Sequence, residues 1–382
     1  MPCTCGRSAY FKRCKEKNVL SSVGHLAIPR RYYACRHCRA KQTPWEGWAG
    51  VTGTHRVTPH ARRMIVLAGS GCSFDESQRN LKELSHLSVS NDVVRRVCDE
   101  EGEAVRKWMN RAPEVKRAFD AADGVVEFST DGLKVNTVGG WREIRQSVIC
   151  KRKPALPVPP EQWDQRVLEA PTVRVAVCGI ARCDLIGAGW QRLVKLLGLP
   201  AGLEISVIAD RRRNRRLPAD GAKWIWDQAA KRFAGRPMQW VVDVYHVMLY
   251  LFAAASALGK EAAEEWVGQR VTELIEMGGP KFIEHLNATG PPEASAATAQ
   301  AWSKLLGYLT DNRDSLWYGK RLTDGLPIGS GLIEGGGKTT LARRLKINSA
   351  RWRIRRAERM GAIRCLQYSG LWEAYWDSKQ AA

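Results

Sequence analysis

Acidic residues at the ends of expected elements are the first candidates for chemistry. Asp131 follows a predicted strand over 125–130, and Glu334 lies near the start of a predicted helix that follows the turn 327–331. Carboxylates are the ligands that Mg²⁺ or Mn²⁺ prefers, and two such ions about 4 Å apart stabilise both the attacking and the leaving oxygen of a phosphodiester. The sequence therefore predicts a divalent-metal site built from carboxylates on separate elements.

The carboxylate that would complete this site has two candidates. Asp210 ends the predicted strand 205–208, whereas Asp220 opens a predicted helix over 221–233. An arginine-rich insertion, 211–218, separates the two residues. The residues alone leave the choice between Asp210 and Asp220 open.

Asp243 and His246 follow the next predicted strand, 239–242. That strand is expected to lie one position farther from the strand of Asp131. Asp243 is therefore predicted to support the metal site rather than to be a primary ligand. His246 is expected to be a hydrogen-bonded structural histidine rather than a metal ligand.

Eleven cysteines include two close pairs near the N-terminus, with the spacing of zinc ligands. The predicted ligands of a structural Zn²⁺ ion are Cys3, Cys5, Cys35 and Cys38. Because Cys-x-Cys is tighter than the usual Cys-x-x-Cys, Cys14 or His37 remains open as a substitute for one ligand. Strands over 19–28 and 30–34 are expected between the pairs, as in a zinc ribbon that folds on binding its metal.

The elements that position the carboxylates follow a defined order. Strands are predicted over 125–130, 141–150, 172–178, 205–208 and 239–242, with helices over 185–197 and 221–233. This order is that of a ribonuclease-H-like α/β fold, in which three antiparallel strands precede two parallel ones. The fourth strand then lies beside the first, which brings the acid that follows it close to Asp131.

The remaining segments are predicted to be helical. Between 51 and 120, Ser73-Phe74 is expected to open a helix and Ser90 to N-cap the next one, and the short turns are compatible with a helix-turn-helix DNA-binding region or with a packed spacer. An all-helical insertion is expected to place Trp266, Trp302 and Trp317 on apolar faces. The predicted domains are 1–50 (zinc ribbon), 51–120 (helical region), 121–243 (first part of the core), 244–325 (helical insertion) and 326–382 (completion of the core with basic C-terminal helices).

The charge predicts a polyanionic partner. Sixty Lys and Arg residues against 39 Asp and Glu residues give a net charge of +21, and nucleic acid is the usual partner of so basic a surface. The basic segment 338–359 is expected to follow a DNA backbone, with Trp352 among its cations. The predicted DNA contacts are Lys338, Arg343, Arg344, Lys346, Arg351 and Arg353.

Other partners are not expected. No run of 18 apolar residues is present, so the sequence predicts no membrane span. With no signal-peptide core at the N-terminus, we expect a reducing cytoplasm and association with the nucleoid. The glycine-rich segment 335–339 lacks the spacing of a phosphate-binding loop, because Leu332 stands where glycine is required, so no nucleotide cofactor is expected.

Several segments together resemble a known family. VVDVYHV (241–247), DGAKWIW (220–226) and PIGSGLIE (327–334), followed by RLK (344–346) and RW (351–352), are similar in order and spacing to the DDE transposases of bacterial insertion sequences, specifically the ISKra group. The N-terminal cysteine pairs and the WEAYW segment (372–376) agree with this resemblance.

The resemblance implies a transposase that cleaves the ends of an element and joins the freed 3′-OH to target DNA. It implies a catalytic triad of Asp131, Asp220 and Glu334 that uses Mg²⁺ or Mn²⁺, with Asp243 and His246 at an accessory position of related Mutator-like enzymes. Duplex DNA and a homo-oligomer on DNA are the implied partners. An inactive or repurposed copy that acts as a zinc-containing DNA-binding protein is the alternative, and a zinc-ribbon RNA-binding protein is a weaker one.

Overall fold

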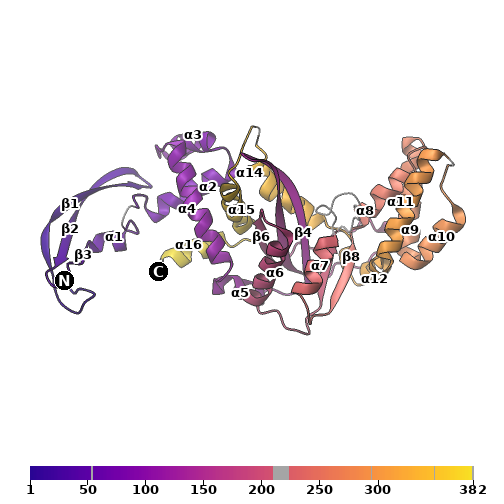
Figure 1. Cartoon of the computed structure of the whole chain (residues 1–382), viewed down its shortest axis with the longest axis horizontal. Coiled ribbons are helices and arrows are strands. Elements are labelled where there is room, and N and C mark those ends of the chain that lie inside the picture. The colour runs from indigo at the N-terminus through magenta and orange to yellow at the C-terminus, as the bar shows by residue number, and fades with distance from the viewer. Residues whose placement is uncertain (53–54, 210–222, 294, 348, 381–382) are drawn as a thin grey trace. The chain divides into compact units, whose positions relative to one another are not determined.

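The computed structural model describes residues 1–52, 55–209, 223–293, 295–347 and 349–380 (Figure 1). The chain forms two compact units. One holds Met1–Ala104 with Ile347–Ser349, and the other holds Val105–Lys346 with Ala350–Ala382. Within the described residues, no helix has both the length and the apolar character needed to cross a bilayer.

A long hairpin dominates the first unit. Strands β1 (Ala9–Ser21) and β2 (Gly24–Cys35) pair antiparallel, and β3 (Lys41–Gln42) adds a short third strand. The two strands predicted here, 19–28 and 30–34, were wrong in their bounds, because residues 21–24 form the turn. Most side chains of β1 are exposed, so the apolar alternation that reveals a half-buried strand is missing.

Helices follow the hairpin: α1 (Pro44–Trp48), α2 (Pro59–Gly71), α3 (Phe74–Ser85), α4 (Asn91–Met109) and α5 (Pro113–Asp120). The predicted N-cap Ser90 is confirmed, and Ser73 caps α3 in the same way. Ser73 Oγ accepts from the Glu76 amide at 3.1 Å, and Ser90 Oγ accepts from the Val93 amide at 3.3 Å. A turn of two residues joins α2 to α3, as expected, while the DNA-reading role of these helices stays a prediction.

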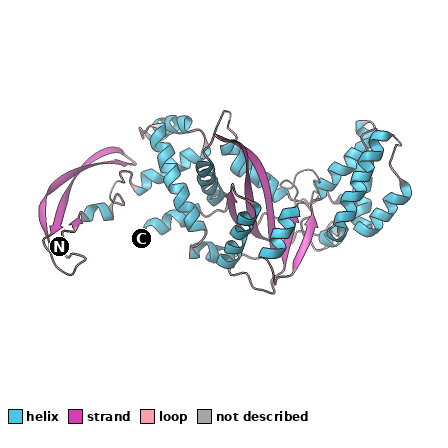
Figure 2. Cartoon of the chain, viewed as in Figure 1, coloured by secondary structure: helices cyan, strands magenta, loops and turns pink. Residues whose placement is uncertain are grey.

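The second unit contains a five-stranded mixed sheet, drawn in magenta in Figure 2. Its strands are β4 (Val125–Thr137), β5 (Gly140–Arg152), β6 (Val173–Gly179), β7 (Ile205–Ala209) and β8 (Met238–Val242), in the order β6-β5-β4-β7-β8. The pairs β4–β5 and β5–β6 are antiparallel, whereas β4–β7 and β7–β8 are parallel. This arrangement confirms that the fourth strand of the sheet lies beside the first.

Helices α6 (Cys183–Leu197) and α7 (Lys223–Arg232) cover one face of the sheet. Phe128 of β4 points to this face, where its ring lies 4.8 Å from that of Trp190 and 4.9 Å from that of Phe233. Because side chains alternate along a strand, Asp131 points to the opposite face. The short helix η1 (Pro160–Gln162) lies in the proline-rich connection that follows β5.

Of the C-terminal helical segments, 331–337 and 354–368 contact that opposite face. All of these segments follow the helical insertion. They are α13 (Gly331–Gly337), the π-helical turn η3 (Lys338–Ala342), α14 (Arg343–Leu345), α15 (Ile354–Tyr368) and α16 (Trp372–Gln380). At Gly361 of α15, an added Cβ would lie 2.6 Å from Cys178 Sγ of β6. Glycine therefore lets α15 approach the sheet closely.

Between β8 and α13 the chain is helical, as predicted. The elements are α8 (Val244–Ala254), α9 (Lys260–Met277), α10 (Gly279–Thr289), α11 (Ala296–Asn312), η2 (Arg313–Ser315) and α12 (Tyr318–Thr323), coloured orange in Figure 1. Trp302 is buried, but Trp317 is 51% exposed, so its predicted placement on an apolar face was wrong. Trp317 precedes the first turn of α12 and lies outside any helical stripe.

Candidate metal centres

Asp243 is held in place by the helix that follows it. The residue comes directly after β8 and is the N-cap of α8, where its Oδ1 accepts a 2.9 Å hydrogen bond from the Tyr245 amide. Its Oδ2 lies 3.1 Å from Nδ1 of His246, one turn along the helix. The Asp243 side chain is fully buried, whereas that of His246 is 19% exposed.

Glu334 reaches the same place from another element. It lies on α13, four residues after Ser330, whose hydroxyl is hydrogen-bonded to Asp243 Oδ2 and lies 3.0 Å from Glu334 Oε1. One donor atom each from Asp243, His246 and Glu334 lies within 4.8 Å of the others, so the group could hold a metal ion. Two segments more than 80 residues apart in sequence thus converge on one spot.

The electrostatics keep Asp243 ionised. Burial alone would raise the pKa of its carboxyl group, but hydrogen bonds from His246, Ser330 and the Tyr245 amide outweigh burial and lower that pKa. A carboxylate that is charged at neutral pH and fixed by three donors needs little reorganisation to receive a cation.

Asp131 lies at the same level of the sheet but outside this group of three. The prediction that it follows the end of its strand was wrong, because β4 continues to Thr137 in pairing with β5. In the β-ladder, Ser129 and Val241 both pair with Ile208, so Asp131 and Asp243 each stand two residues beyond the same rung. They face the same side, with β7 between their strands, which separates the two backbones by roughly 10 Å. Asp131 Oδ1 accepts a 2.7 Å bond from the Gly132 amide, and its side chain is exposed.

The structure gives two of the predicted residues, Asp243 and His246, a more central position than expected. Asp243 and His246 were predicted to be peripheral, with His246 in a structural role only, but their donor atoms meet Glu334. The strand order alone did not reveal this grouping, because Glu334 reaches the end of β8 from helix α13, which is not part of the sheet. The available signal was the Asp-x-x-His spacing at a helix start, which places both side chains on one face. Asp210 and Asp220 lie outside the described residues.

The loop that precedes Glu334 is held by hydrogen bonds to its backbone carbonyls. Arg321 Nε donates to the Pro327 carbonyl at 2.7 Å, Arg166 donates to the Leu326 carbonyl at 2.7 Å, and the Val244 amide donates to the Ile328 carbonyl at 3.0 Å. Sequence reasoning did not identify Arg321 or Arg166. Neither belongs to a motif, and both donate to backbone carbonyls of this loop, which leave no residue-type signal.

The four predicted zinc ligands do come together. Sγ of Cys3 lies 3.4 Å from that of Cys38, and Sγ of Cys5 lies 3.7 Å from that of Cys35. Tetrahedral Zn–S bonds place sulfur atoms about 3.8 Å apart, whereas a disulfide needs about 2.05 Å. The cluster could therefore bind zinc. Cys14 lies on β1, where it is exposed and outside the cluster, and His37 is likewise not part of it.

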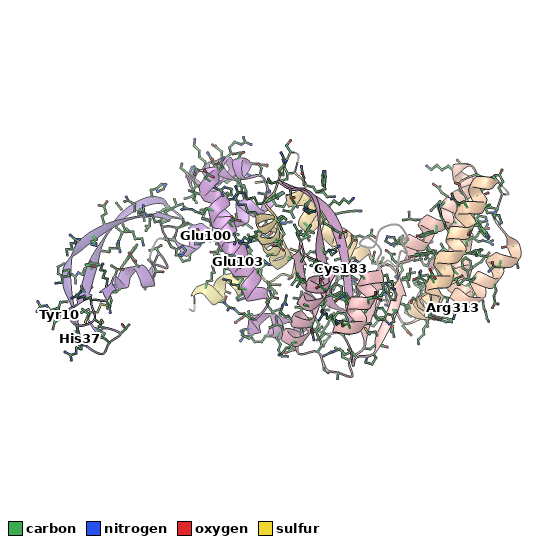
Figure 3. The ribbon with its side chains drawn as sticks, viewed as in Figure 1. Tyr10, His37, Glu100, Glu103, Cys183 and Arg313 are labelled. Carbon is green, nitrogen blue, oxygen red and sulfur yellow. The ribbon has the colours of Figure 1, made fainter. Side chains whose placement is uncertain are left out.

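Backbone amides favour the thiolate form of Cys3 and Cys35, whereas hydrogen bonds with the neighbouring thiols raise the pKa of Cys38 to about 12. The Cys5 amide lowers the pKa of the Cys3 thiol to about 6. The Cys38 and His37 amides lower that of Cys35. Figure 3 shows Tyr10 and His37 at the same end of the hairpin, and the ring of Tyr10 lies 5.0 Å from the guanidinium of Arg36. Cations and thiolates thus share this end of the first unit.

Most of the predicted DNA contacts are on the surface. Exposed cations of the 338–353 segment are Lys338, Arg343, Lys346, Arg351 and Arg353. Arg344 is only 2% exposed, with its guanidinium 4.9 Å from the ring of Trp352, so its assignment as a DNA contact was wrong. Trp352 is also buried and donates to the Leu345 carbonyl at 3.1 Å, so it offers no stacking face.

The comparisons with known proteins give no independent support for these two candidate metal centres. Comparison of the chain with protein-family models found no match, and comparison with curated proteins found none. The two candidate centres therefore depend on the sequence pattern and on the geometry described above.

Proposed function

We propose that the chain is a metal-dependent DNA transposase with a ribonuclease-H-like core and an N-terminal zinc ribbon. The observation that carries this proposal is the convergence of Glu334 with Asp243 and His246 at the carboxyl-end edge of the parallel strands β7 and β8, level with Asp131 in the middle of β4. In parallel strands, that edge is where polar side chains from separate elements meet. The strand order and the resemblance to DDE transposases point the same way.

The donor set suits Mg²⁺ or Mn²⁺. Asp131, Glu334 and either Asp220 or Asp210 would be the carboxylate ligands, with Asp243 and His246 beside them. Such ions lower the pKa of a nucleophilic oxygen and neutralise charge on a phosphodiester in the transition state. The chain itself holds Glu334 through the Ser330 hydroxyl and keeps Asp243 charged through three hydrogen bonds.

The surface cations suit duplex DNA. Lys338 and Arg343 follow Glu334 within three turns of helix, and both are exposed. Phosphate contacts at these residues would orient a DNA strand toward the carboxylates without reading its sequence. We propose that the zinc ribbon and the helices α2–α4 bind element ends, that the active form is a homo-oligomer on DNA, and that the protein works at the nucleoid in the cytoplasm.

The substitution Glu334→Gln tests the proposal. It preserves the shape of the side chain and removes its charge. We expect at least 100-fold slower Mn²⁺-dependent cleavage of duplex DNA that carries the sequences flanking the gene, with DNA affinity unchanged within about twofold. Gel-based cleavage and fluorescence anisotropy measure the two quantities. Glu284→Gln, at an exposed site on α10, is the matched control and should cleave at the wild-type rate.

Two results would redirect the assignment. Equal cleavage by wild type and Glu334→Gln would remove Glu334 from the catalytic centre. DNA binding by the wild-type chain without any metal-dependent cleavage would favour the inactive, zinc-containing DNA-binding protein.

A further inference from the structure

Gln146 is a buried polar residue whose amide has no use in the fold itself. It lies on β5, is 1% exposed, and neither Nε2 nor Oε1 has a hydrogen-bond partner among the described residues. The next residue, Ser147, faces the other side and is fully bonded, to Thr130 Oγ1 at 2.9 Å and to Trp190 Nε1 at 2.8 Å. Since nearly all buried polar groups in native proteins are paired, the Gln146 amide calls for a partner from outside the fold.

The β-ladder places Gln146 beside Asp131. The two residues pair directly across β4 and β5. Side chains of directly opposed residues point to the same face, with their Cβ atoms about 4.5–5.5 Å apart. The Gln146 side chain therefore stands next to a carboxylate of the proposed metal centre.

Helix α13 brings Gly337 close to the Gln146 amide. An added Cβ at Gly337 of α13 would lie 3.9 Å from Gln146 Oε1. Gly337 comes three residues after Glu334, so the two positions share one side of the helix. The Gln146 amide thus lies between the strand that carries Asp131 and the helix that carries Glu334.

We propose that Gln146 is a further residue of this centre, whose amide would donate to the Asp131 carboxylate and accept from a water of the hydrated divalent cation once that cation is bound. This inference rests on the proposed function. An amide nitrogen donates to a carboxylate, and an amide oxygen accepts from coordinated water or ligates a hard cation. Being neutral, the amide orients the carboxylate without adding repulsion between like charges.

The test is a Mn²⁺ titration of the full chain followed by thermal unfolding. Gln146→Met keeps the length of the side chain and removes both polar atoms. Without metal, its Tm should equal or exceed that of the wild type, since two unpartnered polar atoms are removed from the interior. Its Mn²⁺ affinity, read from the metal-dependent rise in Tm, should fall 10-fold or more, which is the usual effect of losing a group that orients a ligand.

A second variant changes charge instead of polarity. Gln146→Glu should lower the Tm of the metal-free chain, because it buries a carboxylate beside Asp131. Its Mn²⁺ affinity should equal or exceed that of the wild type, since the carboxylate faces the cation. Asn312→Leu on α11 is the matched control: Asn312 Oδ1 is also buried and has no partner in the part of the chain that the structure describes, but this variant should keep the wild-type Mn²⁺ affinity.

The outcomes separate this inference from the proposed function. Wild-type Mn²⁺ affinity in Gln146→Met, together with its loss in Glu334→Gln, overturns the role of Gln146 alone. A wild-type chain whose Tm does not respond to Mn²⁺ overturns the metal centre and, with it, the role of Gln146. Weakened binding in Gln146→Met with binding retained in Gln146→Glu and Asn312→Leu supports the inference.

Discussion

Asp243 has a low pKa in spite of complete burial, and its surroundings explain why. An isolated buried carboxylate takes up a proton, because the low dielectric penalises the charged form. Here Ser330, His246 and the Tyr245 amide surround the group and restore the lost hydration. The same contacts fix its direction, so the residue is preorganised for a cation.

Gly329 gives a prediction at this scale. A Cβ at this position would lie 2.9 Å from Cε2 of Tyr245 and 3.2 Å from Asp243 Oδ1. Gly329→Ala should therefore displace the start of α8, lower the free energy of unfolding by about 1–3 kcal/mol and weaken Mn²⁺ binding. Denaturant unfolding and a Mn²⁺ titration measure the two effects.

Gly307 provides the control for that substitution. It lies inside α11, is exposed, and has open space where a Cβ would stand. Gly307→Ala should stabilise the chain by about 0.5–1 kcal/mol through helix propensity. A Gly329→Ala variant as stable as the wild type, with normal Mn²⁺ binding, would contradict the close packing around Asp243.

At the scale of elements, the loop between α12 and α13 decides where Glu334 stands. Arg321 is 5% exposed and bonds the Pro327 carbonyl, Ser206 and Gln239. Burial lowers the pKa of Arg321 to about 10, against the attraction of Glu127. Its guanidinium therefore stays charged at neutral pH and ties the loop to β7 and β8.

Removal of this tie should cost stability and displace the loop. Arg321→Met leaves the Pro327 carbonyl and the Gln239 amide oxygen without their donor, so we expect a loss of about 2–5 kcal/mol in the free energy of unfolding. Urea unfolding measures the loss. Arg313→Met, at the exposed site labelled in Figure 3, is the control and should change stability by less than about 0.5 kcal/mol. An equal loss in both variants would contradict the anchoring role of Arg321.

The sheet was predictable because its strands are buried. Residues 205–209 are buried throughout and are mostly apolar in sequence. The order of such apolar segments and the helices between them predicted the order of the strands in the sheet. The length of β1 was not predictable, since its exposed residues carry no alternating pattern. The meeting of Glu334 with His246 was also hidden, because it depends on where the 325–330 loop directs α13. The burial of Arg344 against Trp352 likewise follows from helix packing. It could not be predicted from the sequence, because Arg344 is one of several neighbouring cations with no feature that distinguishes it.

At the scale of the whole molecule, each compact unit has its own candidate metal centre and a different means of stability. The second unit encloses the sheet between helices. At the cysteine end of the first unit, by contrast, the buried cluster consists of Cys3, Ala9 and Cys35, with Tyr33 and Ala40 packed against it. So small a core supplies little hydrophobic stabilisation, which is the usual reason for a structural metal.

Zinc removal should therefore unfold the cysteine end and spare the sheet. We expect one Zn²⁺ per chain by metal analysis, and loss of that ion in Cys35→Ser. Calorimetry of Cys35→Ser or of the chelated protein should show one transition lost or lowered, while the transition of the second unit persists. Cys14→Ser is the matched control, because Cys14 lies on the same hairpin outside the cluster and should leave the zinc content at one. Full zinc content in Cys35→Ser, or loss of zinc in Cys14→Ser, would mean that the ligands are not the four thiols that the structure brings together.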